Sequence, residues 1–199
     1  AMQPRWLDDK LIFASDRSNW WNLYLLSEDG VRPLCATDAE FCLAQWTLGQ
    51  RSYAIIDDDH LLCTPNRSGE QSIEILTISD GTLHPIADLG TSASCVDVGG
   101  SRHAAALLSY PDRPAAVVLY DLDQRRWSAV RSSAEMIIDS TSVSAAQLVS
   151  WHTEHGTVYG YFYPPTNGEF QAPADTLPPM ITLFRRPLAE DYGDDAIAL

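Results

Sequence analysis

Short apolar runs recur along the chain between polar turns. They include "KLIFA", "NLYLL", "YAII", "IEILTI", "AAALL" and "AVVLYDL", all between residues 10 and 122. Most are rich in β-branched or aromatic residues and all are too short for helices, so they predict β-strands. Several are apolar at consecutive positions, which favours sheets that are covered on both faces. No segment carries a sustained helical period.

The same pattern returns at an interval of about fifty residues. Alignment of three segments, which begin at Ser15, Pro65 and Pro111, brings three arginines to one position: Arg17, Arg67 and Arg113. Asp29-Gly30 falls near Asp80-Gly81, and a charged turn takes this place in the third segment. "WTLG", ending at Gly49, similarly aligns with "VDVG", ending at Gly99. A period of about 40–50 residues is typical of the blades of a β-propeller.

The turns between the runs support antiparallel pairing. Asp-Gly between two apolar runs is a strong hairpin signal, because both residues tolerate positive φ angles. The pattern therefore predicts an all-β chain with about three antiparallel blades of a partial β-propeller in residues 1–145. The repeat fades from about Ala145, where a hairpin-like segment, a Pro-Pro pair and a loop rich in Asn, Gly and Pro follow. We expect a domain boundary near residues 140–150.

Composition and charge narrow the function classes. The 199 residues are 45% hydrophobic, which indicates a folded globular chain. A net charge of −14 argues against binding to nucleic acid and to anionic membrane surfaces. We see neither a signal peptide nor an apolar run of the roughly 20 residues that span a bilayer. The four cysteines have neither CxxC spacing nor the density of a disulfide scaffold, so we expect buried or idle thiols of a cytoplasmic protein: Cys35, Cys42, Cys63 and Cys95.

Three polar motifs are weak candidates for a site. His152 and His155 flank Glu154 but lack the H-E-x-x-H spacing of a zinc helix, so we interpret them as exposed residues of a strand and turn. Asp57-Asp58-Asp59 lacks the alternating oxygen ligands of a calcium loop, which favours a hairpin tip. Asn66-Arg67-Ser68 matches a glycosylation sequon, which has no role in a cytoplasmic protein. No metal site and no cofactor are therefore assigned.

Aromatic and charged residues near the strand starts have two possible roles, in ligand binding or in packing between blades. The six tryptophans either form a stacking platform in a propeller channel or, as we favour, fill the space between blades: Trp6, Trp20, Trp21, Trp46, Trp127 and Trp151. Glu40 and the three repeated arginines either face the channel and bind a peptide terminus or, as we favour for the arginines, bridge neighbouring blades.

Two stretches resemble a known enzyme family. "LIFASDRSNWWNLYLL" with "AEFCLAQWTLG", and "HGTVYGYFYPPTNGEFQAPADTLPPMITL", are similar to the dipeptidyl-peptidase and acylaminoacyl-peptidase branch of the prolyl-oligopeptidase family of serine peptidases. The resemblance extends to about Phe184 and departs locally at Ala44, where the family usually has proline. It implies a β-propeller that restricts substrates to short peptides, followed by the first strands of an α/β-hydrolase domain in residues 146–184.

The resemblance stops after an apolar strand that ends at Phe184. The family typically continues with His-Gly-Gly-Pro, whereas this chain has Arg185-Arg186-Pro187. Reading CAC-GGC-GGC-CC out of frame gives Arg-Arg-Pro, so we expect a frameshifted tail in residues 185–199 and a truncated peptidase. Sequencing of the gene and its downstream DNA tests this hypothesis.

The chemistry of the family's reaction is not encoded in these residues. No G-x-S-x-G nucleophile elbow is present, and "GGSRHA" at Gly99–Ala104 is explained by a hairpin turn. No catalytic residue is therefore assigned, and we expect the chain alone to be inactive. We predict a fragment of a serine peptidase that contributes the substrate filter, with short peptides as partners of the complete enzyme. The alternative is a stand-alone propeller module that completes its ring with a second copy or another chain.

Overall fold

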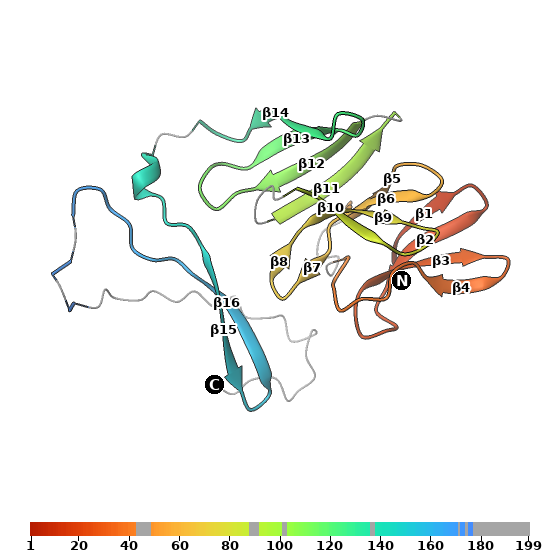
Figure 1. Ribbon diagram of the computed structural model, residues 1–199, viewed down its shortest axis with the longest axis horizontal. Helices are drawn as coiled ribbons and strands as arrows, with labels where there is room; N and C mark the ends of the chain where they lie inside the picture. Colours follow the sequence, from red (N-terminus) through yellow and green to blue (C-terminus); the bar gives the residue numbers. More distant parts are fainter. Residues whose placement is uncertain are drawn as a thin grey trace. The chain divides into compact units, whose positions relative to one another are not determined.

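Strands dominate the part of the chain that the computed structural model describes (Figure 1). The described residues are 1–42, 49–87, 92–100, 103–135, 138–170, 172–173 and 175–176. The chain divides into two units, Ala1–Thr166 and Asn167–Leu199. All the described strands lie in the first unit. In the second, the Asn167 side chain accepts hydrogen bonds from the backbone N–H groups of Glu169 and Phe170 and closes a turn.

Twelve strands form three four-stranded antiparallel sheets. Blade 1 contains β1 (Met2–Leu7), β2 (Lys10–Ser15), β3 (Asn22–Ser27) and β4 (Gly30–Pro33). Blade 2 contains β5 (Tyr53–Ile55), β6 (His60–Cys63), β9 (Ile73–Thr77) and β10 (Leu83–Ala87). Blade 3 contains β11 (Ser92–Gly99), β12 (His103–Ser109), β13 (Ala116–Asp121) and β14 (Arg126–Ser132). Within each sheet the spatial order follows the chain, which confirms the prediction of a partial β-propeller with three blades.

Two further hairpins and one short helix complete the described elements. β7 (Asn66–Arg67) pairs with β8 (Glu70–Gln71) inside the connection between the second and third strands of blade 2. After blade 3 come the 3₁₀ helix η1 (Ser140–Ser142), β15 (Gln147–Thr153) and β16 (Gly156–Phe162). β15 and β16 form a separate two-stranded ribbon in the same unit as the blades. The boundary near residue 145 and the hydrolase assignment of residues 146–184 stay predictions, and residues 185–199 lie outside the described residues.

The blades show which parts of the sequence repeat are structurally equivalent. The three repeated arginines lie at equivalent positions, as the alignment predicts, between the second and third strands of their blades. Asp29-Gly30 and Asp80-Gly81 both lie at the turn between the third and fourth strands, where the glycines have φ angles of 104° and 75°. The alignment of Gly49 with Gly99 is wrong, because Gly49 precedes β5 whereas Gly99 ends β11. Gly49 and Gly99 are therefore not structurally equivalent, although both follow similar apolar residues in the sequence.

Apolar residues bury the contacts between successive blades. Ile12 and Leu25 of blade 1 belong to one core with Leu61 and Leu76 of blade 2. A second core joins blade 2 to blade 3, with Leu62 of β6 and Ala104, Leu108 and Val118 among its members. On the other face of blade 1, Phe13 and Tyr24 stack at 5.9 Å, and the Arg17 guanidinium covers both rings. Coverage on both faces, which the sequence predicts, holds for blade 2 and around Phe13 and Tyr24 of blade 1. It is wrong for blade 3, where burial alternates along β12 and β13 and one face leaves Leu107, Val117 and Leu119 exposed.

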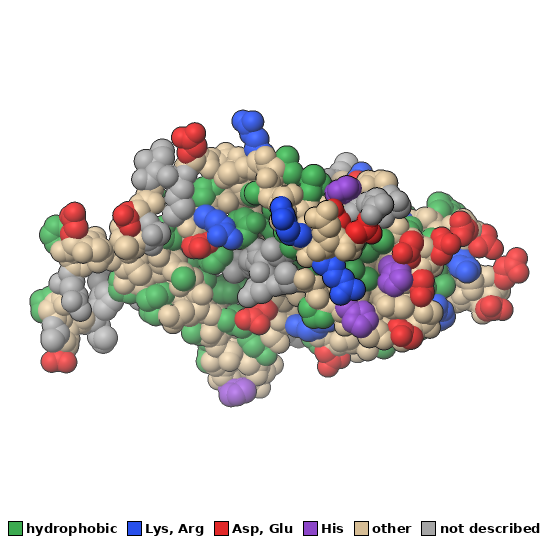
Figure 2. Space-filling model, turned by 45° about the horizontal axis from the view of Figure 1, so that its top comes forward, with side chains coloured by type: hydrophobic (Ala, Val, Ile, Leu, Met, Phe, Trp, Pro, Cys, Tyr) green, Lys and Arg blue, Asp and Glu red, His purple; other side chains and the backbone are tan. Residues whose placement is uncertain are grey.

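In blades 1 and 2, acidic residues gather in the turns that join the first to the second strand and the third to the fourth. Figure 2 shows acidic side chains gathered at the right-hand end of the molecule, where the turns of blade 1 carry four exposed carboxylates: Asp8, Asp9, Glu28 and Asp29. Asp57, Asp58 and Asp59 occupy the corresponding turn between β5 and β6. A large share of the net charge of −14 thus lies in hairpin turns.

Candidate functional site

A pocket of about 270 Å³ lies where the three blades meet. Most of its lining residues are polar by type, but the surface that they present to the pocket is mainly apolar. They come from the segment after β4, the segment before β5, the β7–β8 hairpin and β11. The lining residues are Glu40, Phe41, Cys42, Gln50, Arg51, Ser52, Thr64, Asn66, Gln71, Ala93, Ser94 and Cys95. Concave sites with convergent polar groups are the usual places for small ligands, so this pocket is the candidate site.

The local sequence of the segment after β4 presents Glu40 to the pocket. Ala39 and Phe41 are fully buried on either side of it, and an extended backbone alternates its side chains between two faces. The backbone of Glu40 pairs with that of Asn66 through two N–H···O bonds of 2.9 Å. The Glu40 carboxylate accepts the backbone N–H of Trp21 at 2.8 Å. The carboxylate is therefore half-buried and held in one orientation at the wall of the pocket.

The β7–β8 hairpin connects all three blades at the pocket. Asn66 joins it to blade 1 through Glu40. Gln71 joins it to blade 3, because the Gln71 side-chain oxygen accepts hydrogen bonds from the Ser92 hydroxyl at 2.9 Å and from the Ala93 N–H at 3.0 Å. At its tip, the Gly69 carbonyl accepts a hydrogen bond from the Tyr161 hydroxyl of β16. This six-residue segment thus holds the pocket wall in place from several sides.

The first strand of blade 3 contributes Ala93, Ser94 and Cys95 to the wall, and the first strand of blade 1 contacts lining residues through Gln3. The Gln3 side-chain oxygen accepts hydrogen bonds from Ser52 N–H and hydroxyl at 2.9 and 3.2 Å, and its amide donates to the Cys42 sulfur at 3.2 Å. Gln3 and Cys95 have φ angles of 52° and 53° at irregular registers of β1 and β11. Such β-bulges re-aim side chains, here in two equivalent first strands of the blades.

Two charged side chains of different blades meet beside the pocket. Arg51, which precedes β5, forms an ion pair with Asp97 of β11. The Arg51 carbonyl also accepts the Val96 N–H at 3.1 Å. Both charged groups are about half exposed, so the pair orients Arg51 more than it stabilises the fold. The site thus offers a carboxylate on one wall and a guanidinium on another.

The repeated arginines neither line this pocket nor bridge blades. Arg17 covers Phe13 and Tyr24, Arg67 pairs with Glu74, and the Arg113 guanidinium lies 4.1 Å from the Tyr110 ring centre. Each of these partners belongs to the arginine's own blade or to the connection within it. These contacts therefore do not support the interpretation that the three arginines bridge neighbouring blades, and their orientation towards the propeller channel stays a prediction. The sequence did not predict Arg51 as a site residue, because Arg51 lies outside the aligned repeat segments.

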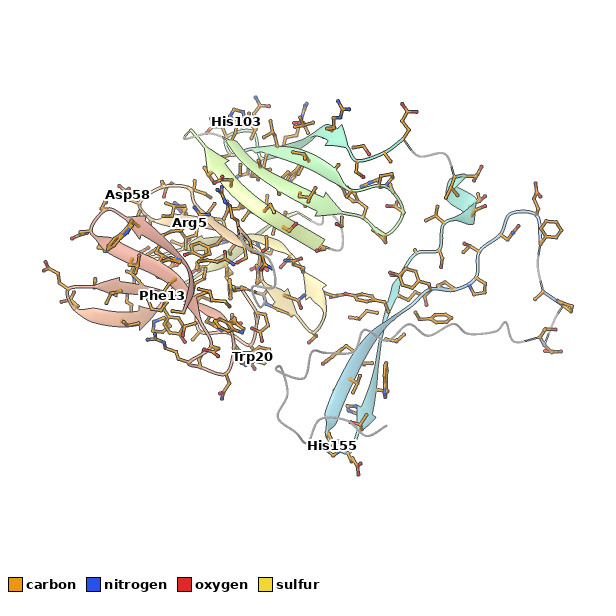
Figure 3. All side chains as sticks on the ribbon, turned by 180° about the vertical axis from the view of Figure 1, so that it is seen from behind. Arg5, Phe13, Trp20, Asp58, His103 and His155 are labelled. Atoms are coloured by element: carbon orange, nitrogen blue, oxygen red, sulfur yellow. The ribbon has the colours of Figure 1, made fainter. Side chains whose placement is uncertain are left out.

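Some of the described tryptophans pack against the cores and others are exposed to solvent. Trp21 and Trp127 pack against the two cores, as the sequence favours. Trp6 and Trp151 are largely exposed, which contradicts that expectation for these two residues. Trp20 is at the margin of exposure, and Figure 3 shows it at the loop end of blade 1. Trp46, like Ala44, lies outside the described residues. No described tryptophan lines the pocket.

The weaker candidates behave as turn residues. The Asp57 carboxylate accepts hydrogen bonds from Asp59 N–H and the His60 ring, in the hairpin tip that Figure 3 marks with Asp58. The His152 ring forms a hydrogen bond with the Thr157 hydroxyl, and His155 lies exposed at the end of the ribbon (Figure 3). Gly99 pairs with His103 across a hairpin. The hairpin interpretations are therefore confirmed, and no cluster of metal-ligating side chains occurs among the described residues.

The thiols differ in exposure. Cys42 and Cys63 are buried, Cys35 is half-buried and Cys95 is exposed, and none of the four forms a disulfide. Burial raises the pKa of Cys42 and raises the pKa of Cys63 well above its ordinary value. The sequon residue Asn66 is half-buried and its side-chain oxygen accepts the Gly69 N–H, so it belongs to the hairpin structure. Throughout the described ranges, no helix has the length and apolarity that a membrane span requires.

Comparisons with solved structures show that the fold of this chain is similar to parts of known peptidases. Puromycin hydrolase has a TM-score of 0.80 and 27% identity over 89% of this chain. A Mycobacterium tuberculosis puromycin-hydrolyzing peptidase has a TM-score of 0.79 and 25% identity over 88%. One of two prolyl endopeptidases has a TM-score of 0.59 and 10% identity over 79%, a likeness that shows the fold alone. No protein-family profile matches the chain, and no curated protein matches it in sequence.

The similarity covers only part of each relative. This chain spans 27% of puromycin hydrolase, 28% of the mycobacterial peptidase and 23% of the prolyl endopeptidase. Its three blades are similar in structure to the propeller part of prolyl-oligopeptidase-type enzymes.

Proposed function

We propose that this chain supplies substrate-filtering blades of a serine-type peptidase of the prolyl-oligopeptidase family. The observation that carries the proposal is the TM-score of 0.80 with puromycin hydrolase over 89% of the chain. Residues 1–145 form the filter, and residues 146–184 contribute the first strands of the hydrolase domain. Hydrolysis of short peptides or amino-terminal residues belongs to the complete enzyme, since the sequence holds no nucleophile elbow.

The pocket is the place where the blades contact a substrate in this proposal. A short peptide with a free amino terminus carries a cationic ammonium group, which donates three hydrogen bonds. The half-buried Glu40 carboxylate is already oriented by the Trp21 N–H, so little ordering cost remains when an ammonium group binds. Ser52, Ser94 and Gln71 supply neutral polar groups around it. Glu40 therefore binds the peptide amino terminus.

The proposal predicts a preference for a free over a blocked amino terminus. Titration of this chain with trialanine and with N-acetyl-trialanine, followed by NMR shifts, measures the preference. Glu40→Gln keeps an acceptor for Trp21 N–H but removes the charge. A lost charge-assisted hydrogen bond is worth about 1.5–3 kcal/mol, so we expect trialanine to bind about tenfold to a hundredfold more weakly.

A neighbouring carboxylate provides the matched control. Asp38→Asn removes the same charge two residues away at an exposed position, and we expect trialanine affinity to change by less than about twofold. Equal binding of the free and acetylated peptides to the unchanged chain contradicts the role of Glu40. A fluorophosphonate probe tests the other half of the proposal, because covalent labelling of this chain on any side chain contradicts a purely filtering role.

A second candidate function is a stand-alone propeller module that completes its ring with another chain. Exposed apolar side chains on both outermost blades favour it, among them Trp6 and Val31 of blade 1 and Val117 of blade 3. Apolar surface of this kind on adjacent strands is typical of an interface.

The cellular setting is part of the proposal. Four cysteines that form no disulfide favour the cytoplasm, where disulfides rarely persist. The charge of −14 favours short peptides and protein chains over nucleic acid or anionic membrane as partners. No cofactor is needed for the filtering role.

A further inference from the structure

One buried side chain bonds the backbone of the segment that carries Glu40. Asn22, the first residue of β3, is 1% exposed. Its side-chain oxygen accepts the Thr37 N–H at 3.1 Å, and its amide nitrogen donates to the carbonyls of Thr37 at 3.0 Å and Ala39 at 3.4 Å. A carboxamide has an acceptor oxygen and two N–H donors, so one orientation of the Asn22 side chain makes all three bonds. Asn22 therefore fixes the backbone immediately before Glu40.

The segment depends on this side chain because it has no regular structure of its own. Residues 34–39 belong to neither a helix nor a strand. Ala39 is fully buried, so water cannot replace a lost hydrogen bond to its carbonyl. A buried carbonyl without its partner is costly. We therefore expect the segment to move when the Asn22 amide is removed.

The neighbouring residue of Asn22 bonds the next part of the same segment. The Trp21 N–H donates to the Glu40 carboxylate at 2.8 Å, and the Trp21 carbonyl accepts the Phe41 N–H at 2.8 Å. Two adjacent residues, Trp21 and Asn22, thus bind a stretch of five residues from Thr37 to Phe41. A shift of the stretch at Thr37 and Ala39 takes the Glu40 carboxylate away from the Trp21 N–H.

We propose that Asn22 is a positioning residue that sets the selectivity of the pocket through Glu40. It holds the Glu40 carboxylate where an ammonium group binds. Asn22 does not belong to the lining of the described pocket, so it acts only through the segment. The ligand in this role, a short peptide with a free amino terminus, rests on the proposed function.

A purely structural role is the competing explanation, because a buried amide with three hydrogen bonds also contributes to stability. The two roles differ for a ligand that lacks the ammonium group. A general structural defect weakens the binding of every peptide. A displaced Glu40 weakens the binding of a free amino terminus and leaves a blocked one unaffected.

Peptide titrations followed by NMR shifts separate the two roles. Asn22→Leu keeps the approximate size of the side chain and removes its three hydrogen bonds. We expect trialanine to bind about tenfold more weakly and N-acetyl-trialanine to change by less than about twofold. Asn22→Ser keeps a hydroxyl for the Thr37 N–H, so we expect a smaller loss. If Asn22→Leu unfolds, the same comparison is made with Asn22→Ser.

Leu76→Ala serves as the control for stability. Leu76 is fully buried in the core of blades 1 and 2, and its truncation removes packing but no side-chain hydrogen bond. Thermal melting measures the stability of each variant, and we expect Leu76→Ala to keep the preference for free trialanine. In a Glu40→Gln background, Asn22→Leu should change trialanine affinity by less than about twofold, because the charge that it positions is already absent.

The Trp21 amide reports the position of Glu40 without any ligand. Its charge-assisted hydrogen bond to the carboxylate shifts the amide proton downfield and slows its exchange with solvent. We expect Asn22→Leu to remove both features, as Glu40→Ala does, and Leu76→Ala to keep them.

Three results overturn the role of Asn22. An unchanged Trp21 amide in Asn22→Leu shows that Glu40 keeps its place without Asn22. An equal loss of affinity for both peptides indicates a general structural defect, and so does an equally large loss of selectivity in Leu76→Ala. Equal binding of free and acetylated trialanine to the unchanged chain is a failure of the proposed function instead, and the Trp21 amide then decides whether Asn22 positions the carboxylate.

Discussion

Arg67 and Glu74 form a two-pronged ion pair inside blade 2, with Nη1–Oε1 and Nη2–Oε2 distances of 2.6 and 3.2 Å. The Glu74 side chain is 5% exposed and that of Arg67 is 37% exposed. The hydrogen bond to Glu74 raises the pKa of Arg67, although desolvation opposes this. The pair anchors the start of β9 beside the β7–β8 hairpin, which forms a wall of the pocket.

Removal of the arginine leaves a buried carboxylate without its cation. We expect Arg67→Ala to lower the free energy of unfolding by about 2 kcal/mol, less than the 3–5 kcal/mol of a fully buried pair because Arg67 is partly solvated. Urea denaturation measures the loss. Arg67→Ala with Glu74→Gln should recover part of it, and a double variant no more stable than Arg67→Ala contradicts the role of the pair.

The Asp80-Gly81 turn requires glycine for two reasons. Gly81 has a φ of 75°, and a Cβ there would lie 2.7 Å from the Leu34 carbonyl oxygen. Gly100 has a φ of 61° with open space around it. We expect Gly81→Ala to cost about 3 kcal/mol and Gly100→Ala about 1 kcal/mol, since only the first adds a clash to the backbone strain. Thermal melting compares them, and equal losses argue against the clash.

Tyr53 should make stability fall at alkaline pH. Its hydroxyl is directed at the carbonyls of Gln3 and Ile12, and burial raises its pKa. The folded chain therefore keeps the phenol proton more tightly than the unfolded chain. This contribution is complete below the unfolded pKa of about 10 and is lost as the pH rises towards the folded value.

Tyr53→Phe isolates this contribution. We expect it to cost about 1 kcal/mol at neutral pH through the lost hydrogen bond, and to flatten the decline of stability above about pH 10. Urea denaturation between about pH 8 and about pH 11 measures both effects. An unchanged alkaline slope would show that other groups cause the decline.

The thiols should react in the order of their exposure. We expect Cys95 to react first with a disulfide reagent near neutral pH, and Cys63 to react only on unfolding, because burial both raises its pKa and excludes the reagent. Mass spectrometry of partly labelled chain identifies the sites. Cys95→Ser should abolish the fast phase, and fast labelling of Cys63 in the folded chain contradicts its burial.

The fold was more accessible to sequence reasoning than the site. Runs such as "NLYLL" and the turn at Asp80-Gly81 encode strands and hairpins locally, so period and turn chemistry predict the three blades. The same repeat aligned Arg17, Arg67 and Arg113 with one another, and all three lie between the second and third strands of their blades. The local signals gave no information on what these side chains contact, because that depends on neighbours brought in by packing.

The pocket depends on contacts between distant segments. Glu40 was a candidate, but Gln3, Arg51 and Gln71 were not, because they carry no motif and meet only when the blades stack. The exposure of Trp6 was also missed, since nothing in its local sequence says which blade face is covered. Its register with Leu11 and Leu26 identifies that face.

The β7–β8 hairpin couples the shape of the pocket to the relative alignment of the blades. Glu40 and Asn66 hold it to one blade by backbone, and Gln71 holds it to another by a single side chain. If blade 3 tilts away, the Gln71 bonds break and the wall formed by Ser94 and Cys95 departs with them. A peptide bound in the pocket, as proposed above, opposes that tilt. Its binding therefore stiffens the contact of the hairpin with blade 3.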